Sequence, residues 1–175
     1  RHEFDAQVSA YDLWDTYLPA FHELVVNAGV SSVMCAYNRF EGQPCCGNDR
    51  LMMTILRDLW GFEGYVTSDC GAIDDFFRFH KTHPDESSAS ADAVIHGTDL
   101  ECGSVYKALS EAVRKGQLSE QQIGVCVKRL FLIRFRLGMF DPEEQVAYNR
   151  IPYTVLESEA HRQHALKMAR ESMVL

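Results

Sequence analysis

Short apolar runs alternate along the chain with segments in which apolar residues recur every three or four positions. The short runs predict β-strands, and the periodic segments predict helices. The expected strands cover residues 32–36, 64–68 and 98–100. The expected helices cover residues 9–28, 48–60, 91–96, 104–115, 119–137 and 156–173. Because strands joined through a helix need a crossover connection, the pattern predicts parallel strands that are buried on both faces.

Several helix ends and apolar faces can be read from the pattern. The first helix begins at a loose capping box, in which Ser9 is followed by Asp12, and Pro19 is expected to bend it. Its expected apolar face comprises Leu13, Tyr17, Phe21, Leu24 and Ala28. The helix that begins at Ser119 is expected to present Ile123, Val127, Leu130 and Leu137. Residues 37–47 are expected to form a polar loop.

Composition and charge exclude several classes of protein. The chain has 46% apolar and 24% charged residues, as an ordinary globular domain does. Its net charge of −8 argues against a nucleic-acid partner, because no basic stripe is available to neutralise phosphates. No apolar run is long enough to cross a bilayer, and the first residues lack the apolar core of a signal peptide. Neither a nucleic acid nor a membrane is therefore expected as a partner.

Six cysteines raise the questions of metal binding and of disulfides. They are Cys35, Cys45, Cys46, Cys70, Cys102 and Cys126. No Cys-x-x-Cys pair occurs among them, so no zinc site is expected. An even number permits disulfides in an oxidising compartment, but cysteines can also pack as small buried thiols. The spacing leaves both states open.

One carboxylate follows directly on a predicted strand. Asp69 lies between the expected strand 64–68 and a turn that contains Gly71. Catalytic carboxylates of α/β barrels occupy such positions at strand ends. Asp69 can equally be the N-cap of the next helix, since aspartate is favoured there. The spacing by itself does not separate these two interpretations.

The expected fold class is α/β, with about half of a TIM-like (β/α)8 barrel. Three strand-then-helix units and a leading helix are present, whereas a closed barrel of eight units takes about 250 residues. An open flavodoxin-like sheet fits the length as well, but no phosphate-binding glycine motif follows a strand. We expect the barrel part to cover residues 1–138. Residues 139–155 are expected to be a linker, and residues 156–175 the first helix of another α/β domain.

Several motifs, taken together, resemble one known family. They are 33–38 (VMCAYN), 42–44 (GQP), 59–66 (LWGFEGYV), 68–72 (SDCGA) and 97–103 (GTDLECG). Their order and spacing are similar to those in the amino-terminal barrel domain of glycoside hydrolase family 3. The resemblance extends over nearly the whole chain and implies the carboxyl-terminal half of that domain.

The resemblance implies a retaining exo-β-glycosidase of the β-xylosidase or β-glucosidase kind, with an oligosaccharide or aryl β-glycoside as substrate. Such an enzyme needs one ionised carboxylate to form a covalent glycosyl intermediate and a second carboxyl to protonate the leaving oxygen. Asp69 aligns with the family's nucleophile, and Tyr37 with the tyrosine beside it. Both are implied to bind the substrate. The general acid is not visible in this chain, and no cofactor or metal is implied.

Other acidic residues have structural interpretations. Asp99 and Glu101 lie at the end of the next strand and are expected to bond neighbouring loops, although a different hydrolase or lyase could use either as a base. Asp74 and Asp75 are expected at a helix start, where the helix dipole favours acids. A carbohydrate-binding or interaction module without catalysis is the remaining alternative.

Half a barrel is also expected to expose strand edges. Proteins cover such edges with another chain, so a homo-oligomer or a complementing chain is expected. The chain alone is expected to be inactive. The family's Lys-His pair and arginine would lie before Arg1, and the parent protein is expected to be periplasmic or secreted.

Overall fold

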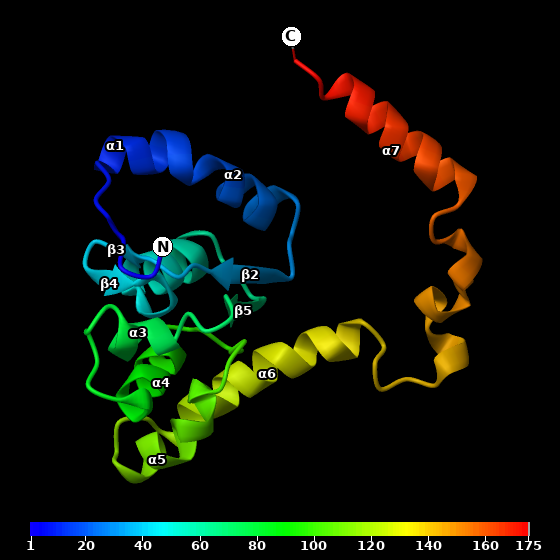
Figure 1. The fold of residues 1–175 in the computed structure, drawn as a ribbon. Coiled ribbons are helices and arrows are strands. Elements are labelled where there is room, and N and C mark those ends of the chain that lie inside the picture. Colours follow the sequence, from blue (N-terminus) through cyan, green and yellow to red (C-terminus); the bar gives the residue numbers. More distant parts are fainter. Residues whose placement is uncertain (175) are drawn as a thin grey trace. The chain divides into compact units, whose positions relative to one another are not determined.

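The computed structural model describes residues 1–174. The chain divides into two compact units, Arg1–Ile133 and a second unit that starts at Arg134. The first unit contains the strands and the helices that precede α7, except for the last residues of α6 (Figure 1). The motifs that carry the family resemblance, between residues 33 and 103, lie in this first unit.

The bounds of the elements are as follows. The strands are β1 (Asp5–Ala6), β2 (Ser32–Cys35), β3 (Arg39–Phe40), β4 (Gln43–Pro44) and β5 (Tyr65–Ser68). The α-helices are α1 (Ala10–Asp12), α2 (Pro19–His22), α3 (Asp74–Arg78), α4 (Glu86–Ile95), α5 (Leu109–Arg114), α6 (Glu120–Arg136) and α7 (Glu159–Glu171). Segments with π-helical bonding are η1 (Leu13–Tyr17), η2 (Glu23–Asn27) and η4 (Arg50–Leu59). The 3₁₀ turns are η3 (Cys45–Gly47), η5 (Val105–Ala108), η6 (Glu143–Gln145), η7 (Ala147–Arg150) and η8 (Tyr153–Val155).

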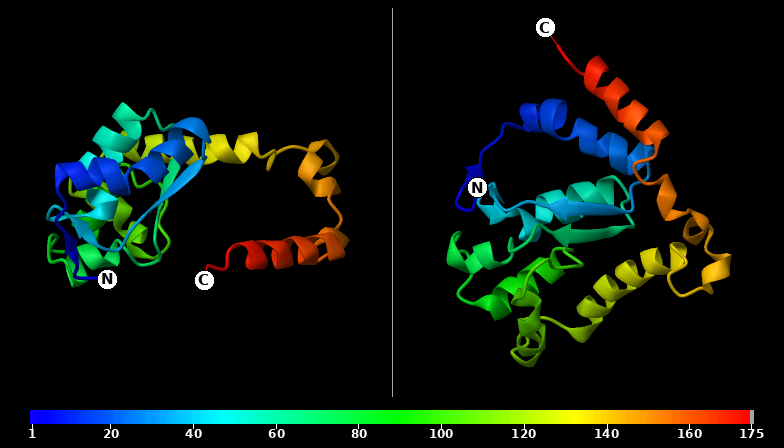
Figure 2. Two further views of the ribbon diagram at one scale, coloured as in Figure 1. Left: turned by 90° about the horizontal axis from the view of Figure 1, so that it is seen from above. Right: turned by 45° about the vertical axis from the view of Figure 1, so that its right-hand side comes forward.

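Strands β2 and β5 are parallel neighbours, as the pattern predicts. Their register runs from Ser32 opposite Tyr65 to Cys35 opposite Ser68, and Figure 2 shows the two strands side by side. Leu100 forms a parallel bridge with Thr67 on β5. The predicted third strand is therefore reduced to a single bridge. The carboxyl ends of all three segments meet at one edge, because parallel strands point the same way.

The predicted loop at residues 37–47 is wrong in part, because it contains a hairpin. Strands β3 and β4 pair antiparallel within it, and β3 also pairs in parallel with β1. Glu41 and Gly42 join β3 to β4 with φ values of 51° and 83°. A two-residue turn with positive φ at both positions suits the twist of a hairpin. The sheet is thus not purely parallel.

The first helical segment buries a different face from the predicted one. Ser9 caps α1 by accepting a bond from Asp12 N, as expected, but Leu13, Leu18 and Val25 are the side chains that are buried. The remaining residues of the predicted face are exposed, namely Tyr17, Phe21, Leu24 and Ala28. The reason is the π-helical bonding of η1 and η2, which shifts the face away from a 3.6-residue repeat.

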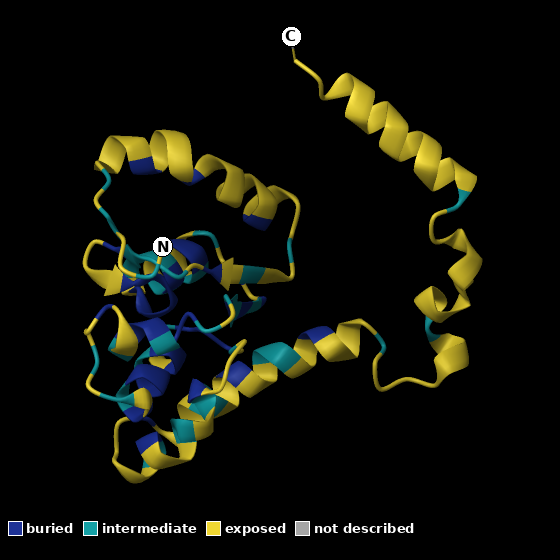
Figure 3. Cartoon of the chain, in the orientation of Figure 1, coloured by how far each residue is buried: buried dark blue, intermediate teal, exposed yellow. Residues whose placement is uncertain are grey.

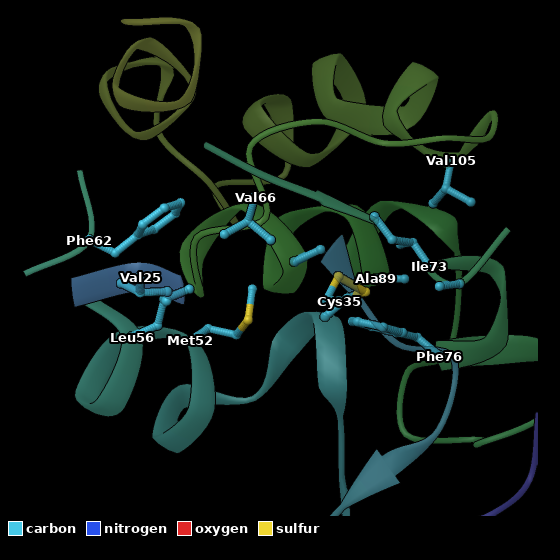
Figure 4. Packing of buried hydrophobic residues seen from close by; sticks show 13 residues of the cluster. Val25, Cys35, Met52, Leu56, Phe62, Val66, Ile73, Phe76, Ala89 and Val105 are labelled. Atoms are coloured by element: carbon cyan, nitrogen blue, oxygen red, sulfur yellow. A yellow bond between two sulfur atoms is a disulfide. The ribbon is translucent and has the colours of Figure 1, made fainter. Parts of the chain in front are cut away.

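The main core lies around β5. Val66 of β5, Ile73 in the turn after it and Phe76 of α3 are each at most 1% exposed. Figure 4 shows them in one cluster with Met52 and Leu56 of η4. Burial of each such side chain contributes about 1.5–3 kcal/mol. The cluster therefore anchors both ends of the turn between β5 and α3, which includes the candidate nucleophile.

Two further helices differ from the sequence expectation. Helix α4 begins at Glu86 rather than at residue 91, because Asp85 and Ser88 form a capping box. Helix α6 has the expected cap between Ser119 and Gln122. It buries Cys126 and Ile133 instead of the predicted Val127 and Leu137, which are exposed.

The second unit contains the predicted linker, residues 139–155, and the predicted last helix. It contains the turns η6, η7 and η8, followed by α7, whose N-cap Ser158 accepts a bond from His161 N. Figure 3 shows α7 exposed along its length. Its assignment to a following domain stays a prediction. Among the described residues, no helix combines the length and apolar character that a membrane crossing requires.

Candidate active site

Tyr37 and Asp69 come together at the carboxyl edge of the parallel strands. Tyr37 follows β2 by two residues, and Asp69 follows β5 directly. The Asp69 backbone N–H donates to Cys35 O at 3.1 Å, which continues the parallel ladder to the last residue of β2. Both side chains are half-buried. The fold therefore places the two predicted site residues next to each other.

Asp69 lies in a tight turn and does not cap a helix. Its Oδ1 accepts a bond from the backbone N–H of Cys70 at 2.7 Å, and its carbonyl accepts one from Ala72 N at 3.0 Å. Helix α3 starts five residues later, with Ile73 at its N-cap position. Gly71 has a φ of 82°, which the turn requires and glycine adopts readily. The helix-cap interpretation of Asp69 is therefore wrong.

Tyr37 bonds the backbone beside Asp69. Its hydroxyl donates to Cys70 O at 2.7 Å. Desolvation, followed by hydrogen bonding to Asp69 and the charge of that carboxylate, raises the pKa of Tyr37. The phenol is accordingly protonated at neutral pH. It can donate a hydrogen bond beside Asp69 without adding a second negative charge.

A disulfide joins the turn after β5 to the segment after Leu100. Cys70 and Cys102 are bonded, with their Cα atoms 4.4 Å apart. Gly71 N donates to Cys102 O at 2.7 Å, and Cys102 N donates to Ser68 Oγ at 3.0 Å. The turn that carries Asp69 is thus tied both covalently and by hydrogen bonds to the neighbouring segment.

The states of the other four cysteines, which the spacing leaves open, divide evenly. Cys35 and Cys46 form a second disulfide with a Cα separation of 5.2 Å. Cys45 and Cys126 are buried free thiols. Burial raises the pKa of Cys45 to about 11 and that of Cys126 to about 12. These two thiols are therefore protonated and poorly reactive.

Asp99 and Glu101 bond structural partners, as expected. The fully buried Asp99 side chain pairs with Arg57 at 2.8 Å and with Arg129 at 3.0 Å. Glu101 accepts bonds from Val105 N at 2.8 Å and from the backbone N–H of the next residue at 2.6 Å. The oxygens of both carboxylates are engaged inside the fold, which disfavours either of them as a catalytic base.

Asp75 has a partner that the sequence does not reveal. Both Asp74 and Asp75 lie in the first turn of α3, as expected. Asp74 forms a partly exposed pair with Arg78 at 3.3 Å. Asp75, however, is buried and its Oδ2 lies 2.8 Å from Nδ1 of His2. No local pattern links positions 2 and 75, so only the tertiary structure identifies His2 as part of the site.

Residues 1–174 contain no group of three or more His, Cys, Asp or Glu side chains that could hold a metal ion.

An apolar cavity of about 180 Å³ lies between the first helical segment, β2 and η4. Its walls include Phe21, Met34 and Ile55 but neither Tyr37 nor Asp69. The cavity belongs to the packing of the helices on the strands and not to the candidate active site.

Parallel strands joined through helices, with a carboxylate and a tyrosine at their carboxyl edge, define part of a (β/α) barrel domain of the kind that carries active sites. Residues 4–133 match the family description "Glycosyl hydrolase family 3 N terminal domain". This match covers most of the chain. The chain belongs to glycosyl hydrolase family 3, and it contains part of the amino-terminal domain.

Individual relatives agree with this assignment. The chain is 50% identical over 170 residues to a protein named "Xylan 1,4-beta-xylosidase" from Xylanibacter ruminicola, and the match covers 96% of this chain and 20% of that protein. The chain therefore spans about a fifth of the length of that relative.

Solved structures show the same partial fold. One is titled "GH3 exo-beta-xylosidase (XlnD) in complex with xylobiose aziridine activity based probe", with 36% identity, a TM-score of 0.86 and coverage of 93% of this chain and 22% of that one. Another is a β-glucosidase, EmGH1, from Erythrobacter marinus, with 28% identity, a TM-score of 0.88 and coverage of 97% and 22%. The predicted partial (β/α) barrel is thereby confirmed.

Proposed function

We propose that this chain is part of a retaining exo-β-glycosidase that removes terminal β-D-xylosyl or β-D-glucosyl residues from oligosaccharides and aryl β-glycosides. Asp69 is the nucleophile in this proposal. The observation that carries it is the half-buried Asp69 carboxylate, which directly follows β5 and lies beside Tyr37. Side chains at this edge of a (β/α) barrel face the substrate.

The geometry suits covalent catalysis. The Cys70 N–H bond to Oδ1 and the disulfide at the next residue hold the carboxylate in one orientation, which favours attack on an anomeric carbon. That attack forms a glycosyl ester on Asp69 and releases the leaving oxygen, which takes a proton from a second carboxyl group. Water then hydrolyses the ester. Tyr37 supports the nucleophile as a neutral donor that bonds the backbone carbonyl of the next residue, Cys70. The described residues do not identify the second carboxyl group.

A β-xylosyl substrate is our first choice. The relative with 50% identity is named a xylosidase, and one structural neighbour is titled an exo-β-xylosidase with a xylobiose-derived probe. Other neighbours are titled β-glucosidases, so glucosides belong in every assay. The names of these relatives support the class of substrate.

We also propose that residues 1–175 need further protein to work. Among the described residues, β2 pairs with β5 but has no strand on its other side. Large apolar side chains such as Phe21 and Phe135 are more than half exposed. A second copy or a complementing chain can cover these surfaces, and the chain alone should turn over little or no glycoside. The two disulfides support an oxidising location, either periplasmic or secreted.

The decisive experiment compares Asp69→Asn with Asp74→Asn in the native polypeptide that carries this segment. Asp74 lies five residues away in a partly exposed ion pair, so its amide variant is a matched control. With an aryl β-xyloside and an aryl β-glucoside, Asp69→Asn should lower turnover by roughly 10³-fold or more, while Asp74→Asn stays within about twofold of wild type.

A covalent label gives a second, independent measurement. A xylose-configured aziridine should esterify Asp69 and raise the intact mass by one label, and peptide mapping should place it on this residue. Unchanged turnover in Asp69→Asn, or a label on another residue, would refute the assignment. Saccharide binding without turnover by the wild-type protein would instead indicate a non-catalytic carbohydrate-binding module.

A further inference from the structure

The buried carboxylate of Asp75, which is not one of the proposed site residues Tyr37 and Asp69, bonds the imidazole of His2. The Asp75 side chain is 2% exposed, and its Oδ2 lies 2.8 Å from Nδ1 of His2, whose side chain is 38% exposed. The two residues come from the chain segment before β1 and from the first turn of α3. Burying a carboxylate is costly unless it is paired, so this contact determines the orientation of the imidazole.

The ring of the neighbouring histidine, His80, makes no hydrogen bond to Asp75, because neither of its nitrogens has a partner. His80 is buried, and burial lowers its pKa, so this ring is neutral at neutral pH. The His80 backbone N–H donates to Asp75 O at 2.7 Å, and its ring stacks on Phe76 at 6.4 Å between centroids. His2 is therefore the side chain in this cluster that bonds the Asp75 carboxylate.

The imidazole of His2 packs directly against the candidate active site. Its ring meets the ring of Tyr37 edge-on, with centroids 5.0 Å apart and planes at 70°. It also contacts Phe79 at 5.2 Å. Edge-to-face contacts of this kind restrict the orientation of an aromatic ring. The Tyr37 hydroxyl bonds Cys70 O, so a rotation of the Tyr37 ring would move this hydroxyl away from its place beside Asp69.

We propose that His2, held by the buried carboxylate of Asp75, is a positioning residue for Tyr37 in the glycosidase reaction. The chain of contacts runs from Asp75 to His2, from His2 to the Tyr37 ring, and from the Tyr37 hydroxyl to the turn that carries Asp69. If His2 and Asp75 had only a structural role, two apolar side chains could fill the same space without burying a carboxylate. The inference rests on the proposed function of Asp69.

Kinetics of His2→Ala test this inference in the native polypeptide. The change should lower kcat on an aryl β-xyloside by about 10- to 100-fold, the effect expected of a small misplacement near the reacting atoms. KM should change less than about threefold, because the lost contact acts on transition-state stabilisation and not on uniform substrate binding. Since Asp75 would then be unpaired, His2→Ala/Asp75→Asn is measured as well, and its kcat should be equally low.

A double-mutant cycle with Tyr37→Phe separates positioning from general destabilisation. Once the Tyr37 hydroxyl is gone, its position no longer matters, so His2→Ala/Tyr37→Phe should be no slower than Tyr37→Phe alone. Losses in kcat that simply multiply would overturn the proposal, as would a kcat within twofold of wild type in a folded His2→Ala protein. Urea unfolding midpoints for each variant establish that it is folded under assay conditions.

Asp69→Asn is measured in the same kinetic assay, so that the failure of one proposal can be distinguished from the failure of the other. If Asp69→Asn is inactive while His2→Ala is unaffected, the positioning role fails and the nucleophile assignment stands. If Asp69→Asn retains turnover, the proposed function fails, and the positioning role fails with it.

Discussion

Replacing Asp99 with asparagine should lower the free energy of unfolding by about 3–5 kcal/mol, the cost of breaking a buried ion pair from one side. The Asp99 carboxylate is fully buried and bonds Arg57 at 2.8 Å and Arg129 at 3.0 Å. It also accepts a bond from Val66 N at 2.8 Å. Burial lowers the pKa of Arg57, whose side chain is 6% exposed, but a guanidinium stays charged. The amide variant therefore leaves a cation inside the fold without its counterion.

Urea titration of the native polypeptide that carries this segment, monitored by near-ultraviolet circular dichroism, measures this loss of stability. The matched control is Glu111→Gln, which makes the same change in the exposed pair with Lys115 and should cost less than about 1 kcal/mol. Turnover per folded molecule should be unchanged by Asp99→Asn. A loss below 1 kcal/mol would refute the reasoning about the buried pair. A large fall in turnover without destabilisation would instead make Asp99 the catalytic base.

Two other predictions concern the disulfides and the pH dependence of stability. Thiol titration of the denatured, unreduced 175-residue polypeptide should detect two free thiols among the six cysteines, and four or more would contradict the pairing. The double variant Cys70→Ser/Cys102→Ser should lower the free energy of unfolding by about 3.7 kcal/mol, as calculated from the 32-residue separation of the two cysteines. Because burial lowers the pKa of His80 in the folded protein, its imidazole takes up a proton at a higher pH in the unfolded chain than in the folded protein. The free energy of unfolding should therefore fall as the pH drops below about 6.5. Unfolding midpoints at pH 7.5 and 5.0 should differ less in His80→Leu than in wild type, and an equal difference would exclude this contribution.

Local signals predicted the features that local physics controls. The strands β2 and β5 are short apolar runs, and their parallel pairing follows from the helix between them. Gly29 and Gly61 end helices with φ values of 64° and 67°, conformations that glycine adopts without strain. Asp69 was identifiable because it directly follows β5. Its catalytic role stays a proposal.

Predictions failed where the backbone departed from regular geometry. The apolar face of the first helix was assigned with a 3.6-residue repeat, but π-helical bonds in η1 and η2 change that repeat. The hairpin at β3 and β4 depends on positive φ at Glu41, which is uncommon for a residue other than glycine. Periodicity carries no information about either feature.

The order of apolar and polar residues was sufficient to establish an α/β chain with parallel strands and a carboxylate at their carboxyl edge, because strand and helix periods and glycine turns act over a few neighbouring residues. The pairing of Cys70 with Cys102, the burial of Asp99 between two arginines and the contact of His2 with Asp75 were decided by tertiary structure. Each joins residues 30 or more positions apart. Such contacts form only when packing around β5 brings distant segments together, so no local pattern encodes them.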